Sequence, residues 1–245
     1  MPDQVRDKSI IVTGGASGIG RALCIGLAAE GGAIAVCDRD LDGAEATAAR
    51  VRAQGGTATP IQVDVARASQ VEDMVRRVLG AYGKIDVLVN AAGIFPRNTV
   101  LEMSEEEWRQ VLDVNLTGAF LCCKAVAGEM IKRRTGKIVN LVSGSAVSGA
   151  LNGAHYAASK GGLSAFTVTL GMELGPYGIN VNGIAPGPTD TPMARGGADA
   201  ARASAPEVPV NRRLGQPEDV VAPVLFFCTD ASKMMFGQLM YLKTP

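Results

Sequence analysis

The chain has 245 residues, and its 24 basic and 24 acidic side chains give a formal net charge of zero. This balance excludes the basic stripe of a nucleic-acid-binding protein and the polybasic patch of a membrane-surface protein. The N-terminus is polar and charged, and no apolar run approaches the roughly 20 residues that cross a bilayer, so we expect a soluble, cytoplasmic protein.

Five cysteines and a single histidine limit the metal and redox chemistry of the chain. No C-x-x-C pair occurs, and most of the cysteines lie in apolar segments. We interpret them as buried, inert thiols in a reducing compartment, and we expect no metal site.

Short β-branched runs alternate with helical stretches along the whole chain, which predicts an α/β fold. Several strands are apolar on both faces, as expected for parallel strands that helices cover. The expected strands are Ile10–Thr13, Ile34–Cys37, Thr59–Val63, Val87–Asn90, Ile138–Val142, Val181–Ile184 and Leu239–Leu242.

Helices are expected between these strands, and glycine pairs end some of them. Two helices carry predicted capping boxes, in which a serine and a glutamate three residues later cap each other's backbone amides: Ser69 with Glu72, and Ser104 with Glu107. The expected helices are Arg21–Glu30, Asp42–Gln54, Val71–Tyr82, Glu105–Arg133, Tyr156–Leu174 and Asp219–Thr229.

The alternation predicts a Rossmann-type, doubly wound, seven-stranded parallel sheet with helices on both faces. No repeat or low-complexity linker interrupts the chain, so residues 1–245 are expected to form a single domain. The least regular stretch, about 187–216, is rich in Ala, Arg, Gly and Pro. Because loops at the carboxyl ends of such strands form the ligand crevice, we interpret this segment as a substrate lid rather than a linker.

A glycine-rich turn at residues 13–20 follows the first strand and opens the first helix. Gly14, Gly18 and Gly20 allow the backbone to approach a pyrophosphate closely, and the free N–H groups and dipole of the helix would bind it. The spacing is G-x-x-x-G-x-G rather than the general G-x-G-x-x-G, so the dinucleotide fingerprint is matched in role and not letter for letter.

Asp38 ends the second strand at the place, about 20 residues after the glycine turn, where a carboxylate accepts hydrogen bonds from the adenosine ribose. The carboxylate would repel a 2′-phosphate, which favours NAD over NADP. Arg39 keeps NADP as the alternative, because a guanidinium could pair with that phosphate. We interpret Arg39 as a solvated start to the next loop, and NAD is the predicted cofactor.

Tyr156 and Lys160 are four residues apart at the start of a long expected helix, so they lie on one face of it. A nearby ammonium favours the phenolate, and Lys160 is therefore expected to lower the pKa of Tyr156 into a useful range. Ser143, at the end of the fifth strand, could bind the substrate oxygen beside Tyr156. Alone this would be an ordinary helical pair; the glycine turn and Asp38 favour the catalytic interpretation.

These residues resemble the short-chain dehydrogenases/reductases in their short, single-domain form, over essentially the whole chain. Residues 13–20 are similar to the family's T-G-x-x-x-G-I-G turn, and residues 90–93 spell its N-A-A-G segment. Pro186, Gly187 and Thr191 fit its P-G-x-x-x-T segment. The order and spacing of the family's catalytic tetrad are matched by Asn115, Ser143, Tyr156 and Lys160.

The resemblance implies a role for each tetrad residue. Tyr156 would be the general acid or base, and Lys160 would hold the nicotinamide ribose. Ser143 would fix the substrate oxygen, and Asn115 would keep a water chain to Lys160. The domain would thus both bind the dinucleotide and catalyse the reaction.

The resemblance also implies a set of cofactor contacts. Asp64 and Val65 would meet the adenine, and Asn90 and Gly93 would line the adenosine side. Thr189 and Thr191 would hold the carboxamide and phosphate end. The full implied set is Gly14, Ser17, Gly18, Ile19, Gly20, Asp38, Asp64, Val65, Asn90, Gly93, Tyr156, Lys160, Pro186, Gly187, Thr189 and Thr191.

The chain departs from the family pattern in two places. Ser145 rivals Ser143 as the substrate-binding serine, but it is two residues too close to Tyr156. The family's V-D-G-G ending is replaced by Y-L-K-T-P at residues 241–245, which puts the C-terminal contacts in doubt. Because this region faces a neighbouring subunit in family tetramers, a homotetramer is expected by analogy.

Arg97, Arg195 and Arg202 lie in segments expected to rim the substrate crevice. They could bind an anionic substrate group, although most loop arginines are simply solvated. His155 adjoins Tyr156 but should point away from the site, since each helical residue is rotated by about 100° from the last.

The predicted function is an oxidoreductase that transfers hydride between NAD(H) and a secondary alcohol or ketone. One alternative is an NADP(H)-dependent 3-oxoacyl-type ketoreductase. Another is a non-catalytic dinucleotide-binding regulator, which the presence of Tyr156, Lys160 and Ser143 disfavours. An epimerase or dehydratase of the extended relatives would need a larger C-terminal domain. The identity of the substrate stays open.

Overall fold

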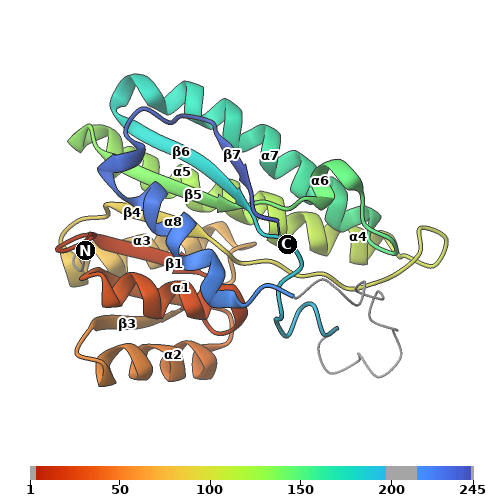
Figure 1. Cartoon of the computed structure of the whole chain (residues 1–245), viewed down its shortest axis with the longest axis horizontal. Helices are drawn as coiled ribbons and strands as arrows, with labels where there is room; N and C mark the ends of the chain where they lie inside the picture. Colours follow the sequence, from red (N-terminus) through yellow and green to blue (C-terminus); the bar gives the residue numbers. More distant parts are fainter. Residues whose placement is uncertain (1–3, 197–213, 244–245) are drawn as a thin grey trace.

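The computed structural model describes residues 4–196 and 214–243. Within these residues seven strands form one parallel sheet in the order β3-β2-β1-β4-β5-β6-β7, which confirms the predicted Rossmann-type arrangement (Figure 1). The strands are β1 (Ser9–Thr13), β2 (Ala33–Asp38), β3 (Thr57–Gln62), β4 (Val87–Asn90), β5 (Gly136–Leu141), β6 (Ile179–Ala185) and β7 (Leu239–Tyr241).

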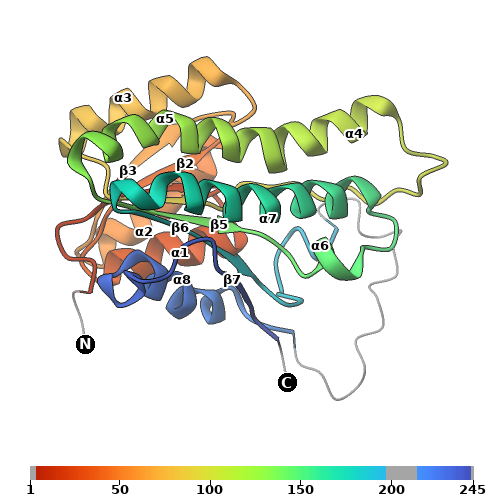
Figure 2. The same ribbon diagram turned by 90° about the horizontal axis from the view of Figure 1, so that it is seen from above.

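Helices cover both faces of the sheet. Helices α1, α2 and α8 lie on one face, and α3, α5 and α7 lie on the other, with α4 extending the line of α5 (Figure 2). The helices are α1 (Gly18–Ala29), α2 (Leu41–Ala53), α3 (Ala68–Tyr82), α4 (Glu105–Leu112), α5 (Gly118–Arg133), α6 (Ser145–Ser148), α7 (Ala154–Leu174) and α8 (Val221–Cys228).

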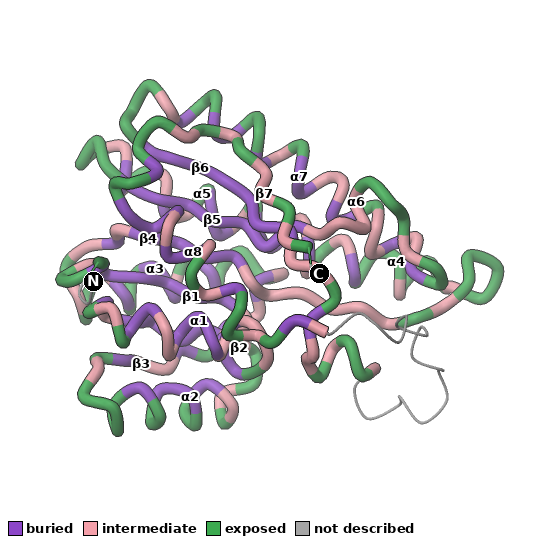
Figure 3. Tube along the Cα trace, in the orientation of Figure 1, coloured by how far each residue is buried: buried purple, intermediate pink, exposed green. Residues whose placement is uncertain are grey.

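The central strand β1 shows why these strands are apolar throughout. Ile10 and Val12 pack into the core under α1, α2 and α8, whereas Ile11 packs into the core under α3, α5 and α7. All five residues of β1 are buried, and Figure 3 shows the same burial along the neighbouring strands. A sheet with two covered faces needs apolar side chains on both, so alternation with polar residues is absent from β1.

The sheet reverses its strand order at β1. This strand pairs with β2 on one side and with β4 on the other. The loops that leave the carboxyl ends of β1 and β4 therefore diverge, and in doubly wound sheets such a switch point is where ligands bind.

The helix predicted over residues 105–133 is divided by a π-helical turn, Asp113–Thr117. The apolar spacing on either side of this turn stays helical, so the sequence pattern does not reveal it. By length and composition alone, the stretch 105–133 is the one part of the described chain long and apolar enough to cross a bilayer. Helix α5 packs on β4 and β5 and beside α3, and core helices of soluble proteins meet the same criterion.

The two capping predictions differ in outcome. At the start of α4, Ser104 Oγ accepts the backbone N–H of Glu107 at 3.0 Å, as predicted. The Glu107 carboxylate binds His155 and Asn98 instead of the Ser104 N–H, so only half of this capping box forms. The capping box of Ser69 is wrong, because α3 already begins at Ala68 and has no side-chain cap. The turn before α3 is closed instead by Gln70, whose side-chain oxygen accepts the N–H of Asp64 at 2.8 Å.

Candidate active site

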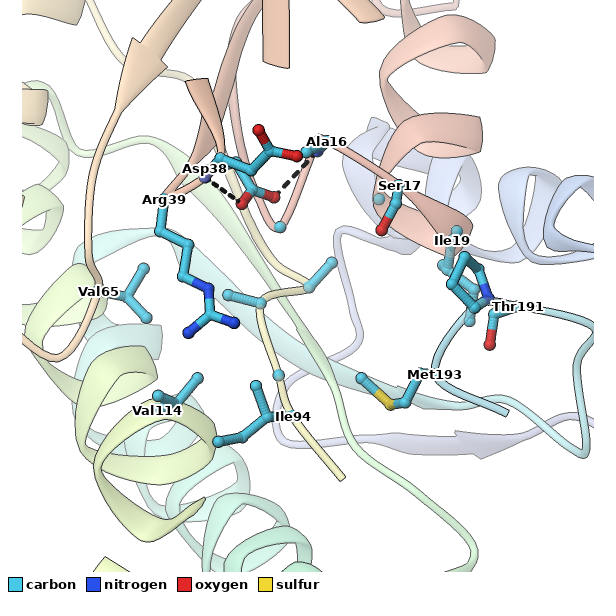
Figure 4. Close-up of a pocket in the computed structure, with 18 of the residues that line it drawn as sticks. Ala16, Ser17, Ile19, Asp38, Arg39, Val65, Ile94, Val114, Thr191 and Met193 are labelled. Atoms are coloured by element: carbon cyan, nitrogen blue, oxygen red, sulfur yellow. Dashed lines mark hydrogen bonds between the residues drawn. The ribbon is translucent and has the colours of Figure 1, made fainter. Parts of the chain in front are cut away.

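A cleft of about 360 Å³ lies at the switch point, between the glycine turn, the loops after β2 and β3, the N-A-A-G segment and the loop after β6 (Figure 4). Ile94, Val114 and Met193 also line it, and no pattern in the sequence had singled them out. The predicted cofactor residues that line this cleft are Gly14, Ser17, Gly18, Ile19, Gly20, Asp38, Asp64, Val65, Gly93 and Thr191.

The glycine turn has its shape because side chains are missing. A Cβ on Gly14, whose φ is +74°, would lie 2.8 Å from the backbone of Ala92. A Cβ on Gly20 would collide with the carbonyl group of Gly14. Gly18 has φ +51°, a conformation that favours glycine, and its missing side chain faces Thr191. The turn is therefore a bare backbone surface at a helix N-terminus, which fits the pyrophosphate of a dinucleotide.

Asp38 and Arg39 meet the same part of the cleft with opposite charges. The Asp38 carboxylate accepts the N–H of Ala16 at 3.0 Å through one oxygen and the N–H of Asp40 at 3.0 Å through the other. These two bonds hold the carboxylate at the cleft wall beside the glycine turn. Figure 4 shows the Arg39 side chain extending into the cleft, and the residue is exposed, as expected for a solvated loop arginine.

Asn90, one of the predicted cofactor contacts, does not line this cleft. Its side chain is buried and donates to Asn140 Oδ1 at 2.8 Å and to Cys123 Sγ at 3.3 Å. Because successive strand residues face opposite sides of a sheet, the side chain at the end of β4 points toward the helices while the following residues reach the cleft. Asn90 thus joins β4 to β5 beneath the cleft.

The four residues of the predicted tetrad come together at the carboxyl ends of β4 and β5. Lys160 is buried, and its Nζ donates to the carbonyl oxygen of Leu141 at 2.6 Å. The same Nζ lies 5.7 Å from the centre of the Tyr156 ring. The Ser143 side chain lies beside the Tyr156 phenol and lowers its pKa. Ser145 is not the partner; its N–H donates to Ser143 Oγ at 3.2 Å.

Asn115 reaches this group from the π-helical turn. Its side-chain amide pairs with the backbone of Ile94, accepting the N–H at 2.8 Å and donating to the C=O at 3.0 Å. A Cβ on Gly93 would lie 3.3 Å from Asn115 Oδ1 and 3.9 Å from Lys160 Nζ. Gly93, which lines the cleft, therefore lies between the cleft and the side chains of Asn115 and Lys160.

The pKa values of Tyr156 and Lys160 are shifted by burial. Burial raises the pKa of Tyr156, and the hydrogen bond from Ser143 only partly offsets this. Burial lowers the pKa of Lys160 to about 8. In the protein alone the pKa of Tyr156 is thus raised and not lowered as expected, because burial disfavours the charged phenolate.

Phe95 is a further neighbour of Tyr156. Its ring stacks on the Tyr156 ring with centroids 4.2 Å apart and an interplanar angle of 19°. The Arg97 guanidinium covers the Phe95 ring, 4.8 Å from its centre. No motif signals such a stack, since its members are about 60 residues apart in the chain and meet only when β4 and α7 pack on one sheet.

The loop after β6 closes one side of the cleft. Thr191 lies against Gly18, whereas Pro186, Gly187 and Thr189 do not line the cleft, and Thr189 donates its hydroxyl to the carbonyl of Gly187 at 2.9 Å. In the lid predicted for 187–216, residues 197–213 and with them Arg202 lie outside the described residues. Arg195 is paired with Asp190, through two contacts of 2.7 Å.

The chain matches the family model described as short chain dehydrogenase over residues 8–201. It is 36% identical to the 3-oxoacyl-[acyl-carrier-protein] reductase FabG of Staphylococcus epidermidis, over 96% of this chain and 97% of that one. It is 40% identical to the short-chain reductase protein NovJ of Streptomyces niveus, over 97% of this chain and 93% of that one.

A solved structure shares the whole fold. It is a provisionally assigned NAD(P)-dependent gluconate 5-dehydrogenase from Beutenbergia cavernae that holds NADP at low occupancy. The TM-score is 0.88 at 34% identity, covering 98% of this chain and 97% of that one. With a glycine-lined dinucleotide cleft, a Tyr–Lys pair beside it and relatives that match almost end to end, this chain belongs to the short-chain dehydrogenase/reductase family of oxidoreductases.

Proposed function

We propose that this oxidoreductase transfers hydride between NAD(H) and a secondary alcohol or ketone, with Tyr156 as its proton donor and acceptor. The observation that carries the proposal is the Tyr156 phenol, which lies beside Ser143 and next to buried Lys160. Gly93, which lines the cleft, lies between the cleft and Lys160. The nicotinamide would supply or receive the hydride when it is bound.

The chain's own residues would handle the proton. In the reducing direction Tyr156 gives its phenolic proton to the carbonyl oxygen, and Ser143 donates a hydrogen bond that orients this oxygen. A phenol with a raised pKa is protonated at neutral pH, which suits the reducing direction. Lys160 Nζ lies 5.7 Å from the centre of the Tyr156 ring and would stabilise a phenolate formed there, although burial keeps the net pKa of Tyr156 raised. The Asn115 side chain is hydrogen-bonded to the backbone of Ile94 beside this pair.

The dinucleotide would lie along the predicted cofactor residues that line this cleft. Ser17, Ile19 and the turn glycines would face the pyrophosphate, while Asp64 and Val65 would border the adenine. Lys160 would also hold the nicotinamide ribose. Thr191, together with the segment from Pro186 to Thr189, would border the nicotinamide end.

The preference for NAD stays a proposal, supported by the Asp38 carboxylate at the cleft wall. The comparisons do not support this preference, since the neighbouring gluconate 5-dehydrogenase holds NADP. Arg39 reaches into the cleft and favours the alternative, an NADP(H)-dependent ketoreductase. The test is the ratio of kcat/KM for NADPH to kcat/KM for NADH. Asp38→Asn should raise this ratio, and Arg39→Gln should lower it. A ratio that Asp38→Asn leaves unchanged would rule out the NAD assignment.

The substrate is proposed only as a class. The 3-oxoacyl reductase among the relatives supports a 3-oxoacyl compound as one candidate. Among the described residues, Arg97 lies over the Phe95 ring that stacks on Tyr156, where it could bind an anionic group of the substrate. Arg97→Ala should then raise KM for a 3-oxo acid but not for its methyl ester, and equal KM changes for the two would remove this role.

Further proposals concern the form of the protein. We propose one domain, because the described strands all join one sheet. The segment 187–216 as a lid, a homotetramer and a cytoplasmic location remain proposals by analogy with the family. Size-exclusion chromatography with light scattering tests the tetramer.

The decisive experiment follows NADH and NADPH absorbance with a panel of ketones, alongside a Tyr156→Phe control. Turnover that depends on Tyr156 is the expected result. A wild-type protein that binds the dinucleotide but reduces none of the ketones, and oxidises none of the corresponding alcohols, would instead favour a non-catalytic dinucleotide-binding protein.

A further inference from the structure

The helix that carries Tyr156 has no N-cap side chain. The first N–H groups of a helix lack partners within it, and a polar side chain at the N-cap usually accepts one of them. At the N-cap of α7 stands Gly153, which has no side chain. A Cβ at this position would lie 2.5 Å from Phe95 Cε2, so the ring that stacks on Tyr156 leaves no room for an ordinary capping residue.

His155 supplies the missing hydrogen bond from inside the helix. Its Nδ1 accepts the backbone N–H of Tyr156 at 2.8 Å, and its ring is fully buried. Because Nδ1 is an acceptor, the neutral imidazole carries its proton on Nε2. Nε2 lies 3.1 Å from Glu107 Oε1 and donates to it. The histidine is therefore fixed at both nitrogens.

Glu107 is held in turn by the segment that follows β4. Its backbone N–H is bound by Ser104 Oγ at 3.0 Å, and its second carboxylate oxygen accepts Asn98 Nδ2 at 3.3 Å. The N–H of Asn98 donates to the carbonyl of Asn152, just before α7, at 2.8 Å. The segment after β4 thus contacts the start of α7 through side chains and backbone.

We propose that His155, held by Glu107, is a positioning residue that fixes the backbone of Tyr156 and thereby the place of its phenol beside Ser143. The inference rests on the proposed function, in which Tyr156 transfers the proton. Phe95 fixes the ring face and His155 fixes the main chain, so the two together determine where the phenol oxygen lies. Displacement of a reacting group by about 1 Å can lower a rate by about a hundredfold, which makes such fixing consequential.

Two variants separate the two hydrogen bonds of His155. The Oδ1 of Asn stands as many bonds from Cβ as Nδ1 of His, so His155→Asn keeps the acceptor for the Tyr156 N–H and loses the contact with Glu107. The amide nitrogen of Gln can reach Glu107 as Nε2 does, so His155→Gln keeps that contact and loses the acceptor. His155→Ala loses both.

We expect kcat to fall by about ten- to a hundredfold in His155→Ala and His155→Gln, at a nearly unchanged dissociation constant for the dinucleotide. His155→Asn should stay within a few-fold of the wild-type kcat. Glu107→Gln keeps an acceptor for Nε2–H and should also stay close to wild type. Should His155→Ala not fold, the comparison of Asn with Gln still decides. Wild-type kcat in His155→Gln, or no recovery in His155→Asn, would overturn the proposal.

Hydrogen exchange at the single Tyr156 amide gives a readout that does not need activity. It should be faster in His155→Ala and His155→Gln than in wild type, and unchanged in His155→Asn. If the wild-type protein reduces no ketone while the exchange pattern holds, the proposed function fails and the hydrogen bond to Tyr156 stands. If the wild type is active and neither exchange nor kcat responds to His155→Gln, the positioning role fails.

Discussion

The cofactor cleft and the surroundings of Tyr156 are built in opposite ways. The glycine turn is one short stretch of chain whose shape comes from absent side chains at Gly14, Gly18 and Gly20. Around Tyr156 the shape comes from side chains that meet across long separations in sequence. Lys160 contacts a carbonyl 19 residues away, Asn115 a peptide 21 residues away, and His155 a carboxylate 48 residues away. The turn should therefore be intolerant of added atoms, and the Tyr156 region of removed ones.

Removing the phenol oxygen of Tyr156 should have the largest effect. Tyr156→Phe keeps a ring to stack on Phe95 but has no proton to transfer, so kcat should fall by about 10²–10⁴-fold, the usual share of general acid–base catalysis. The dissociation constant for NADH should change by a few-fold at most. Steady-state kinetics and fluorescence titration measure the two quantities. Tyr177→Phe, at a tyrosine that is 40% exposed, is the matched control, and a comparable loss there would contradict the assignment.

The burial of Lys160 should appear as a pH dependence of stability. Its pKa is about 8 in the folded protein and near its ordinary value of 10.5 when unfolded. Between these values the unfolded state binds more protons, so the free energy of unfolding should rise with pH. Relative to Lys160→Met, the wild type should gain about 3 kcal/mol across this range, as each pKa unit corresponds to about 1.4 kcal/mol.

Denaturant unfolding of both proteins at a series of pH values measures this difference. The comparison with methionine, which fills a similar volume, cancels the titration of the other groups. A difference that stays constant from about pH 8 to 10.5 would show that Lys160 is not desolvated in the folded protein.

An added methyl group in the glycine turn should have a smaller effect than the change at Lys160. It should lower both the stability of the protein and its affinity for the dinucleotide. In Gly20→Ala the new Cβ meets the Gly14 carbonyl group, which is backbone and cannot rotate away. Overpacking of this kind costs about 1–3 kcal/mol. Affinity for the dinucleotide should fall too, because the displaced turn carries the N–H groups that would face the pyrophosphate. Thermal unfolding and cofactor titration check both; unchanged affinity would remove the turn from the cofactor site.

A glycine-to-alanine substitution outside the turn should have the smallest effect, and it should raise the free energy of unfolding rather than lower it. Gly80 is exposed on α3 with a helical backbone, and a Cβ there would meet nothing within 4 Å. Gly80→Ala should stabilise the protein by about 0.5–1 kcal/mol, the gain in helix propensity. Its dinucleotide affinity should equal that of the wild type. Destabilisation by Gly80→Ala would mean that the loss expected in Gly20→Ala cannot be assigned to the turn.

Much of the cleft could be predicted because its information is local. The three glycines lie at one strand–helix junction, and the acidic residue ends the next strand. The role of each can be predicted from its own short segment without knowledge of distant residues. Asn90 shows the limit of this reasoning. It belongs to a matching motif, yet its side chain faces Asn140 and not the cleft, because strand pleat and helix packing decide which way a side chain points.

The sequence by itself determined the fold class, the family and the side chains proposed for proton transfer, because hydrophobic periodicity and motif spacing can be read directly from the order of the residues. The tertiary structure alone decided how those side chains are held. It revealed the π-helical turn under Asn115, the stack of Phe95 on Tyr156, the bond from Tyr156 to His155 and the burial that moves the pKa values of Tyr156 and Lys160. Burial and long-range contacts exist only after the sheet has brought β4, β5 and α7 together, and no local pattern encodes them.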